Sequence, residues 1–152
     1  MLRMSKLTDY GTLVLAQLAA GHGVVASAGQ VAEATHLGQP TVSKLLKSLA
    51  RAGLVVSARG VQGGYVLARP PESISAAEIL DALEGPVAIT ECSGANSCCD
   101  LEKFCRVGRA WQKINSSIRK ALQQVSLADL QMQAHPLPPP DLKAAFTSEA
   151  AR

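Results

Sequence analysis

The chain has 152 residues, of which 47% are hydrophobic but only 3% aromatic, so one core built from Ala, Leu, Val and Ile is expected. This length fits a compact domain with an added oligomerisation element and excludes two independent enzyme domains. The net charge is +3, yet residues 1–69 hold seven Lys/Arg against two Asp/Glu and residues 70–152 hold eight against ten. The basic first part therefore favours an anionic partner.

Three helices are predicted in the first third of the chain. The first is expected at about residues 8–20, where apolar residues recur at three- and four-residue steps. Ser27 and Gln30 form a capping box that opens a second, short helix ending near His36. A tight turn follows, and Pro40 is expected as the first residue of a third helix, which Gly53 ends in a left-handed conformation.

A β-hairpin is predicted directly after these helices. Residues 54–58 and 65–68 favour strands, and the glycine-rich residues 60–64 favour the turn between them. Ser75 and Glu78 then form a second capping box, which opens a helix that ends at Gly85. The predicted fold is thus mainly α with a small β-hairpin wing, and the head spans residues 1–85.

The last predicted helix, Arg106–Gln131, carries a heptad seam. Apolar residues in it are spaced four, three, four, three and four residues apart, which is typical of a helix that pairs with another helix. They are Val107, Trp111, Ile114, Ile118, Ala121 and Val125. We therefore predict a homodimer joined along residues 106–132, followed by a disordered, proline-rich tail at residues 133–152. No membrane partner is expected, since no apolar run reaches the roughly 18 residues of a span.

A short helix, a tight turn, a second helix rich in Thr, Ser and Lys, and a basic hairpin together indicate a winged helix-turn-helix that binds double-stranded DNA. A helix fits the major groove, where its early residues face base edges, while a hairpin crosses the neighbouring backbone. The predicted contacts are Thr41, Ser43 and Lys44 at bases, Gln39, Lys47 and Arg51 at phosphates, Arg59 in the minor groove, and Gly63 and Gly64 in the wing. Two plainer interpretations remain open: a solvated amphipathic helix, and an ordinary hairpin turn at the glycines.

The N-terminus superficially imitates a secretory signal. Arg3 and Lys6 precede an apolar stretch, and Ala26-Ser27-Ala28 looks like a cleavage site. Asp9 and Gln17 interrupt that stretch, and a DNA-reading unit would need the first helix in place. A cytoplasmic location is the better inference.

All four cysteines, Cys92, Cys98, Cys99 and Cys105, lie within fourteen residues. Cys92, Cys99 and Cys105 could converge from one loop, residues 86–105, on a metal centre. Paired Cys-x-x-Cys knuckles are lacking, so an iron–sulfur cluster is favoured over zinc. A thiol–disulfide switch that involves Cys98 or Cys99 also remains open.

Several segments in this order resemble the Rrf2 family of winged-helix regulators. They are residues 5–10 (SKLTDY), 40–44 (PTVSK), 59–65 (RGVQGGY) and 83–86 (LEGP), together with the loop of Cys92, Cys99 and Cys105. The match spans about residues 1–132 and is nearest to members that regulate the Suf iron–sulfur assembly system. It implies a homodimeric transcription factor, usually a repressor, whose cluster state alters its affinity for its operator.

The resemblance also implies a ligand set for a 2Fe–2S or 4Fe–4S cluster. The family's cysteine ligands fall on Cys92, Cys99 and Cys105. Some relatives add a histidine three residues after the last cysteine, but this chain has Gly108 there. Other relatives use an acidic residue near the start of the first helix, often from the partner subunit, and Asp9 stands at that place. Asp9 is also an ordinary first-turn helix residue, favoured by the helix dipole.

No enzyme activity is expected, because no catalytic triad or paired-carboxylate pattern is present, and no small-molecule substrate is predicted. The two functions carried forward are a cluster-sensing transcription factor for Suf-type assembly genes and, as the alternative, a thiol-based redox-switch transcription factor without a cluster.

Overall fold

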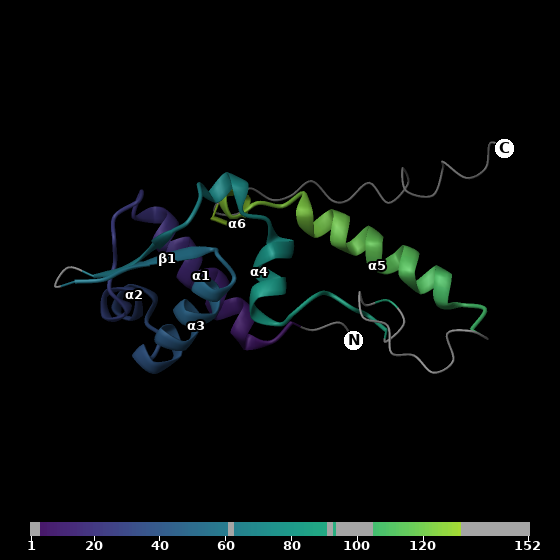
Figure 1. Cartoon of the computed structure of the whole chain (residues 1–152), viewed down its shortest axis with the longest axis horizontal. Coiled ribbons are helices and arrows are strands. Elements are labelled where there is room, and N and C mark those ends of the chain that lie inside the picture. The colour runs from purple at the N-terminus through teal and green to yellow at the C-terminus, as the bar shows by residue number, and fades with distance from the viewer. Residues whose placement is uncertain (1–3, 61–62, 91–92, 94–104, 132–152) are drawn as a thin grey trace.

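The computed structural model describes residues 4–60, 63–90, 93 and 105–131. Its elements are α1 (Lys6–Ala20), α2 (Ala28–Thr35), α3 (Gln39–Arg51), β1 (Val55–Ala58), β2 (Gly64–Leu67), η1 (Pro71–Ser73), α4 (Ala76–Leu83), α5 (Gly108–Gln123) and α6 (Leu127–Gln131). Figure 1 shows α5 projecting from a head that contains the other elements. The predicted fold class, mainly α with a β-hairpin, is confirmed.

The core of the head lies where α1 packs against α2, α3, α4 and α6. Its largest fully buried side chains are aliphatic: Leu15, Leu45, Leu46, Leu49, Leu54, Ile74, Ile79, Leu127, Val14, Val31 and Val42. None of these is aromatic, as the composition led us to expect. Leu127 is a notable member, because it comes from α6, which the sequence pattern had placed outside the head.

Short capping motifs set the helix starts. Both predicted capping boxes are present, with Ser27 and Gln30 opening α2 and Ser75 and Glu78 opening α4. Two details differ from the prediction: α1 begins at Lys6 rather than near residue 8, and Pro40 is the second residue of α3 rather than the first. Since Ser5 caps α1 through its hydroxyl, the helix begins two residues earlier than the apolar spacing indicated.

The hairpin is antiparallel, with Val55 opposite Leu67 and Ala58 opposite Gly64. Its second strand is also bridged to the segment before α2, because the Ala26 and Tyr65 backbones exchange hydrogen bonds of 3.0 and 2.8 Å. Gly64 makes this approach possible. A Cβ placed there would lie 2.4 Å from the Ala26 carbonyl oxygen, which is closer than real Cβ atoms come to any neighbour.

Gly64→Ala is therefore expected to destabilise the protein by about 1–3 kcal/mol, the usual cost of forcing extra atoms into a packed site. Gly29→Ala is the matched control. Its added Cβ would meet nothing closer than 3.7 Å inside α2, and Ala at a helical position should stabilise by about 0.5–1 kcal/mol. Urea unfolding of the two variants should move the midpoint in opposite directions. Equal midpoints would contradict the packing explanation for Gly64.

The predicted single helix over Arg106–Gln131 is wrong. The chain leaves the helix at Gln124, and a second helix, α6, begins at Leu127. Ser126 and Asp129 exchange the hydrogen bonds of a third capping box, and the Leu127 amide donates to the Ile74 carbonyl at 2.7 Å. The heptad spacing runs to Val125 but then gives way to this local cap. The long helix is thus α5 alone, and α6 belongs to the head.

A carboxylate ties the end of α4 to the start of α1. Glu84 Oε1 accepts hydrogen bonds from the Ser5 backbone amide at 2.9 Å, from the Ser5 hydroxyl at 2.8 Å and from the Thr8 hydroxyl. The Thr8 and Ser5 side chains, followed by the Ser5 amide, lower the pKa of Glu84 below its ordinary value of 4.5. Glu84 of the LEGP segment thus joins the end of α4 to the N-cap and first turn of α1.

Stability should consequently fall with acid. A carboxyl whose pKa is lowered on folding stabilises the protein fully above its unfolded pKa, near 4.5, and loses that effect as the pH drops through the folded value. Glu84→Gln should therefore show a smaller loss of urea midpoint between pH 7 and pH 3 than the natural chain. In a Thr8→Val background, which lacks the donor with the largest influence, the effect of Glu84→Gln should shrink. An unchanged pH dependence would contradict this role of Glu84.

Candidate DNA interface and cysteine loop

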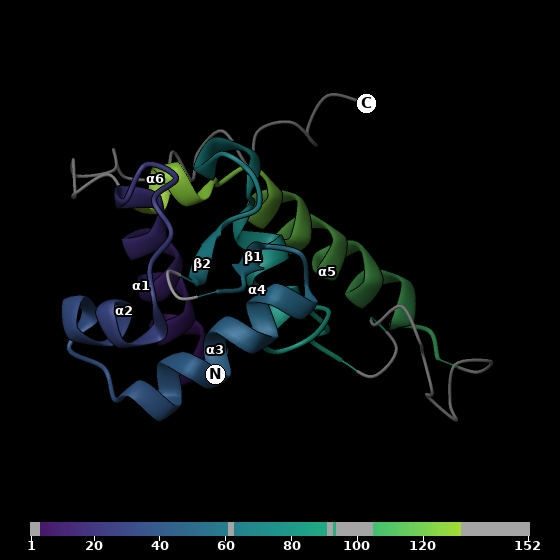
Figure 2. The same ribbon diagram turned by 60° about the vertical axis from the view of Figure 1, so that its left-hand side comes forward.

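Helix α3 has two distinct faces. Val42, Leu45, Leu46 and Leu49 are buried in the core, so the opposite face must point outward. Of the predicted DNA contacts on this helix, Ser43 is half-buried and the rest are exposed: Gln39, Thr41, Lys44, Lys47 and Arg51. The helix holds three cations and no Asp or Glu. Figures 1 and 2 show α3 along an outer edge of the head, where DNA could reach it.

The start of α3 is open as well as basic. Gly38 is its N-cap and makes no side-chain capping hydrogen bond. The first-turn amides of a helix have no partner within the helix and favour negative charge. The exposed end of α3 therefore combines unfilled amide donors with the cations Lys44 and Lys47, an arrangement suited to phosphate.

The wing places Arg59 in an exposed position immediately after β1. Gly63 and Gly64 are half-buried, and both have backbone reasons to be glycine. A Cβ on Gly63 would lie 2.6 Å from the Ala58 carbonyl oxygen, and Gly64 packs against Ala26 as described above. The ordinary turn that the sequence left open is therefore present. Any DNA contact at these two glycines would come in addition to that structural role.

Of the predicted cluster ligands, only Cys105 and Asp9 fall among the described residues. Cys92 and Cys99, like Cys98, lie outside them. Cys105 is a half-buried free thiol just before α5. A Cβ on Gly108 would lie 3.6 Å from its sulfur, so position 108 is next to this thiol. Within the described part of the chain, no group of three His, Cys, Asp or Glu side chains could hold a metal ion.

Asp9 and Cys105 are far apart in one chain. Asp9 is exposed in the first turn of α1 and lines an apolar hollow with Leu122 and Val125, at the C-terminal end of α5. Cys105 precedes the N-terminal end of the same helix. Because a helix rises 1.5 Å per residue, the 16 residues of α5 separate its ends by about 24 Å. A single chain therefore does not bring these two predicted ligands together.

Polar contacts that sequence reasoning missed hold α5 against the head. The Arg119 guanidinium donates to both carboxylate oxygens of Asp81 on α4, at 3.0 and 2.5 Å, and this contact raises the arginine pKa. One turn earlier, the Asn115 amide donates to the Val87 and Ser93 carbonyls, each at 3.0 Å. These pairs span 22 to 38 residues of sequence, so no local pattern marks them.

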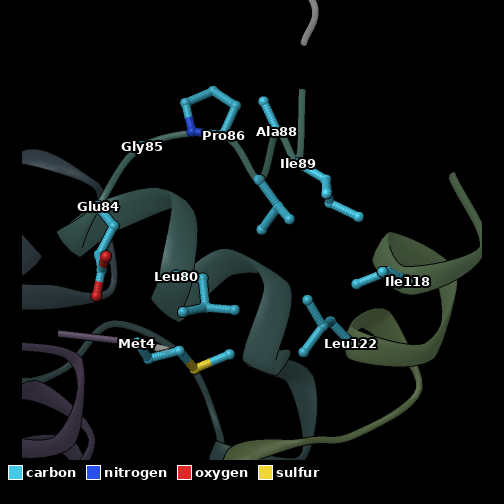
Figure 3. Close-up of a pocket in the computed structure, with 10 residues that line it drawn as sticks. Met4, Leu80, Glu84, Gly85, Pro86, Ala88, Ile89, Ile118 and Leu122 are labelled. Carbon is cyan, nitrogen blue, oxygen red and sulfur yellow. The ribbon is translucent and has the colours of Figure 1, made fainter. Parts of the chain in front are cut away.

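The seam side of α5 is exposed. Val107, Trp111, Ile114 and Val125 keep 37–58% of their surface accessible. Ile118 of the seam and the nearby Leu122 face a hollow of about 320 Å³ that Met4, Leu80 and Ile89 also line. Figure 3 shows these side chains around the open space between α4 and α5. Seam and hollow together form a continuous apolar surface on α5 and the side of α4 that faces it.

Helix α3 with one face buried, the preceding α2 and the two-stranded wing define a winged helix-turn-helix protein of the DNA-binding class. Comparison with known proteins specifies it further. Residues 4–133 match the Rrf2 family, described as iron-dependent transcriptional regulators. The chain belongs to this family, and it is a transcriptional regulator and not an enzyme.

Similar proteins include two kinds of Rrf2 regulator. The HTH-type transcriptional regulator CymR of Bacillus subtilis (strain 168) is 32% identical over 130 residues, which are 85% of this chain and 89% of CymR. The solved structure of that protein, described as the global cysteine regulator of B. subtilis, matches with a TM-score of 0.65 and 31% identity, over 86% of this chain and 97% of CymR. T. potens IscR matches with a TM-score of 0.61 and 34% identity, over 85% of both chains.

Staphylococcus aureus CymR in its oxidized form is also similar, with a TM-score of 0.60 and 29% identity, over 88% of this chain and 98% of that one. In the described part of this protein, no helix is both long and apolar enough to span a membrane.

Proposed function

We propose that the protein is a homodimeric, cytoplasmic repressor of Suf-type iron–sulfur assembly genes whose affinity for its operator changes with the state of an iron–sulfur cluster. The observation that carries the proposal is that Ser93 and Cys105, the described residues on either side of the loop, both lie next to α5. Cys105 lies three residues before the start of that helix and beside Gly108, and Ser93, the neighbour of Cys92, is bound to the helix through Asn115. The described residues at the two ends of the loop are therefore both held next to one helix, which would favour a shared set of thiolate ligands.

Cys92, Cys99 and Cys105 would hold the cluster, and their thiolates suit iron–sulfur ligation in either a 2Fe–2S or a 4Fe–4S centre. When bound, the cluster would supply a centre that responds to oxidants and to iron supply. Asp9 remains the proposed fourth ligand. Since α5 separates it from Cys105 in one chain, it would have to come from the partner subunit. This arrangement would make the cluster depend on the dimer.

The apolar seam of α5 supports the dimer, and the basic face of α3 supports DNA binding. Two heads related by a two-fold axis would read a symmetric operator. Their α3 helices would lie roughly 34 Å apart, one turn of DNA, or a multiple of it. Gln39, Thr41, Ser43, Lys44, Lys47 and Arg51 would then contact the groove and backbone, with Arg59 and the Gly63-Gly64 wing beside them. A shift of α5 relative to the heads would change this spacing and so the affinity.

Anaerobic purification tests the cluster. The natural chain should be brown, with iron and sulfide in equal amounts. Cys92→Ala and Cys105→Ala should abolish the colour, and Cys98→Ala is the matched control that should retain it. A colourless protein with one equivalent of zinc would remove the cluster proposal. Loss of colour in Cys98→Ala, with colour kept in Cys105→Ala, would overturn the ligand assignment.

The second candidate is a thiol switch that controls the same DNA-binding head. It is favoured by the neighbouring Cys98 and Cys99 and by the similarity to a CymR whose oxidized form is known. Mass spectrometry of air-exposed protein separates the two functions. A disulfide or sulfenic acid that forms reversibly in a chain without iron, together with altered DNA affinity, would favour the switch.

A further inference from the structure

Gly64 lies between two parts of the DNA-binding head. Across the hairpin it pairs with Ala58, the residue before the exposed Arg59. On its other side, a Cβ at position 64 would lie 2.4 Å from the Ala26 carbonyl oxygen and 2.9 Å from the Ser27 nitrogen. Real Cβ atoms do not come that close, so the β2 backbone lies where a residue with a side chain could not. Glycine therefore lets the base of the wing touch the segment that leads into α2.

Two backbone hydrogen bonds secure this contact. The Ala26 amide donates to the Tyr65 carbonyl at 3.0 Å, and the Tyr65 amide donates to the Ala26 carbonyl at 2.8 Å. Ser27, the next residue, is the N-cap of α2, and its hydroxyl accepts a hydrogen bond from the Gln30 amide at 3.2 Å. The bridge to the wing and the capped start of α2 thus occupy two consecutive residues. Moving β2 away from Ala26 would break the bridge at the entrance to α2.

The first turn of α2 also meets the start of α3. A Cβ on Gly29 would lie 3.7 Å from the Nε2 of Gln39, the first residue of α3. The other end of α3 leads into the wing, where the Leu54 amide donates to the Leu49 carbonyl at 3.0 Å and the Ala68 amide donates to the Leu54 carbonyl at 3.0 Å. The wing is therefore attached to α3 directly at one end and through α2 at the other. Two separate attachments fix the angle of the hairpin as well as its position.

We infer that Gly64 is a positioning residue for DNA binding: it lets β2 rest on Ala26 and Ser27, and this contact sets the angle between the wing and α3. The inference rests on the proposed function, in which both elements contact one DNA duplex. In that arrangement, Arg59 and Lys44 meet neighbouring parts of the duplex, so their separation has to match its geometry. A side chain at position 64 would push β2 away from α2 and carry Arg59 out of its contact.

Residual dipolar couplings of backbone amides measure this angle without DNA. In Gly64→Ala, the orientation of β1 and β2 relative to α3 should change, while α1, α3 and α4 keep their protection from hydrogen exchange. Exchange at the Tyr65 amide should become at least about tenfold faster, since its bond to Ala26 opens. Ala26→Pro removes the other bridging bond without placing a Cβ at position 64, and it should shift the same orientation if Gly64→Ala does not fold. Ile79→Val, a small change in the buried face of α4, is the matched control and should leave the orientation unchanged.

Operator binding tests the consequence for function. In the natural chain, Arg59→Ala should weaken binding by at least about fivefold. In a Gly64→Ala background, the same change should have an effect of less than about twofold, because the arginine has already left its contact. Arg59→Ala and Lys44→Ala should instead be additive, since they remove contacts made by separate elements. Ile79→Val should retain the full effect of Arg59→Ala, which separates positioning from a general loss of stability.

An unchanged orientation of the hairpin in folded Gly64→Ala or Ala26→Pro would overturn the inference. So would a changed orientation with the full effect of Arg59→Ala, because the contact would then be independent of Gly64. Loss of protection throughout the head in both variants would also contradict it, since a positioning residue leaves the fold intact. If Arg59→Ala has no effect in the natural chain, the proposed wing contact fails, and the dipolar couplings still decide whether Gly64 sets the angle of the wing.

Discussion

Ile114→Asp is expected to convert the protein from a dimer to a monomer. Ile114 is 44% exposed in the middle of the α5 seam, between Trp111 and the half-buried Ile118. A carboxylate there would lose its water on pairing with an apolar partner face, which is costly without a compensating charge. The fold of the single chain should survive, because this side chain already faces outward. Sedimentation analysis of the natural and substituted proteins would show the change in mass.

The same substitution should reduce affinity for a two-site operator by about a hundredfold or more. A dimer binds its second half-site from a high effective concentration, and that advantage is typically worth factors of about 10² to 10⁴. Ser116→Asp is the matched control: it adds the same charge to α5 on the side opposite the seam, next to Lys113 and Lys120. It should stay dimeric and bind normally. An Ile114→Asp protein that remained dimeric would place the interface elsewhere.

The hollow beside the seam increases the expected effect. Ile118 and Leu122 extend the apolar surface of α5 toward Leu80 and Met4 (Figure 3). Exposed apolar patches of this kind on a monomer mark interaction surfaces. An α5-based dimer is also consistent with the wide separation of Asp9 and Cys105 in one chain. Such a dimer would allow the partner subunit's Asp9 to approach Cys105.

Local signals predicted most of the head. The two capping boxes, the apolar spacing of the first three helices and the glycine-rich hairpin each depend on residues within a few positions of one another, and each is present. The break between α5 and α6 has a local signal too, the Ser126-x-x-Asp129 box. The heptad pattern obscures it, because the apolar spacing continues to Val125. A periodic pattern reports which face is apolar but not whether the backbone stays helical.

The contacts that sequence could not supply are the distant ones. Ser5 and Glu84 lie 79 residues apart, Asn115 and Val87 lie 28 apart, and α2, α3 and β1 separate Ala26 from Tyr65. Val87, Ala26 and Tyr65 make these contacts through backbone groups, which carry no side-chain signal. Only packing of the core brings the partners together. The exposed face of α3 was predictable. Val42, Leu45, Leu46 and Leu49 form its buried face, so the remaining residues of the helix must face outward.

That face carries the second large effect: Lys44→Ala should weaken operator binding by at least about tenfold while leaving the dimer intact. Lys44 is exposed one turn into α3, opposite the buried leucines, where a recognition helix meets base edges and phosphates. A good base contact is worth about 1–3 kcal/mol, and a dimer loses two of them. Fluorescence anisotropy with a duplex selected by the protein from a random-sequence library would measure the loss.

The salt dependence separates a base contact from a phosphate contact. If Lys44 reads a base, its removal should relax sequence preference at one operator position. If it neutralises a phosphate, the slope of log affinity against log salt should fall by about one for each phosphate that is no longer neutralised. Lys113→Ala removes an equal charge from the outer side of α5 and is the matched control, which should change neither quantity. If the Lys44→Ala and Lys113→Ala proteins bound DNA with equal affinity, DNA would be bound by another surface. Loss of a positive charge from α3 would then matter no more than loss of one from α5.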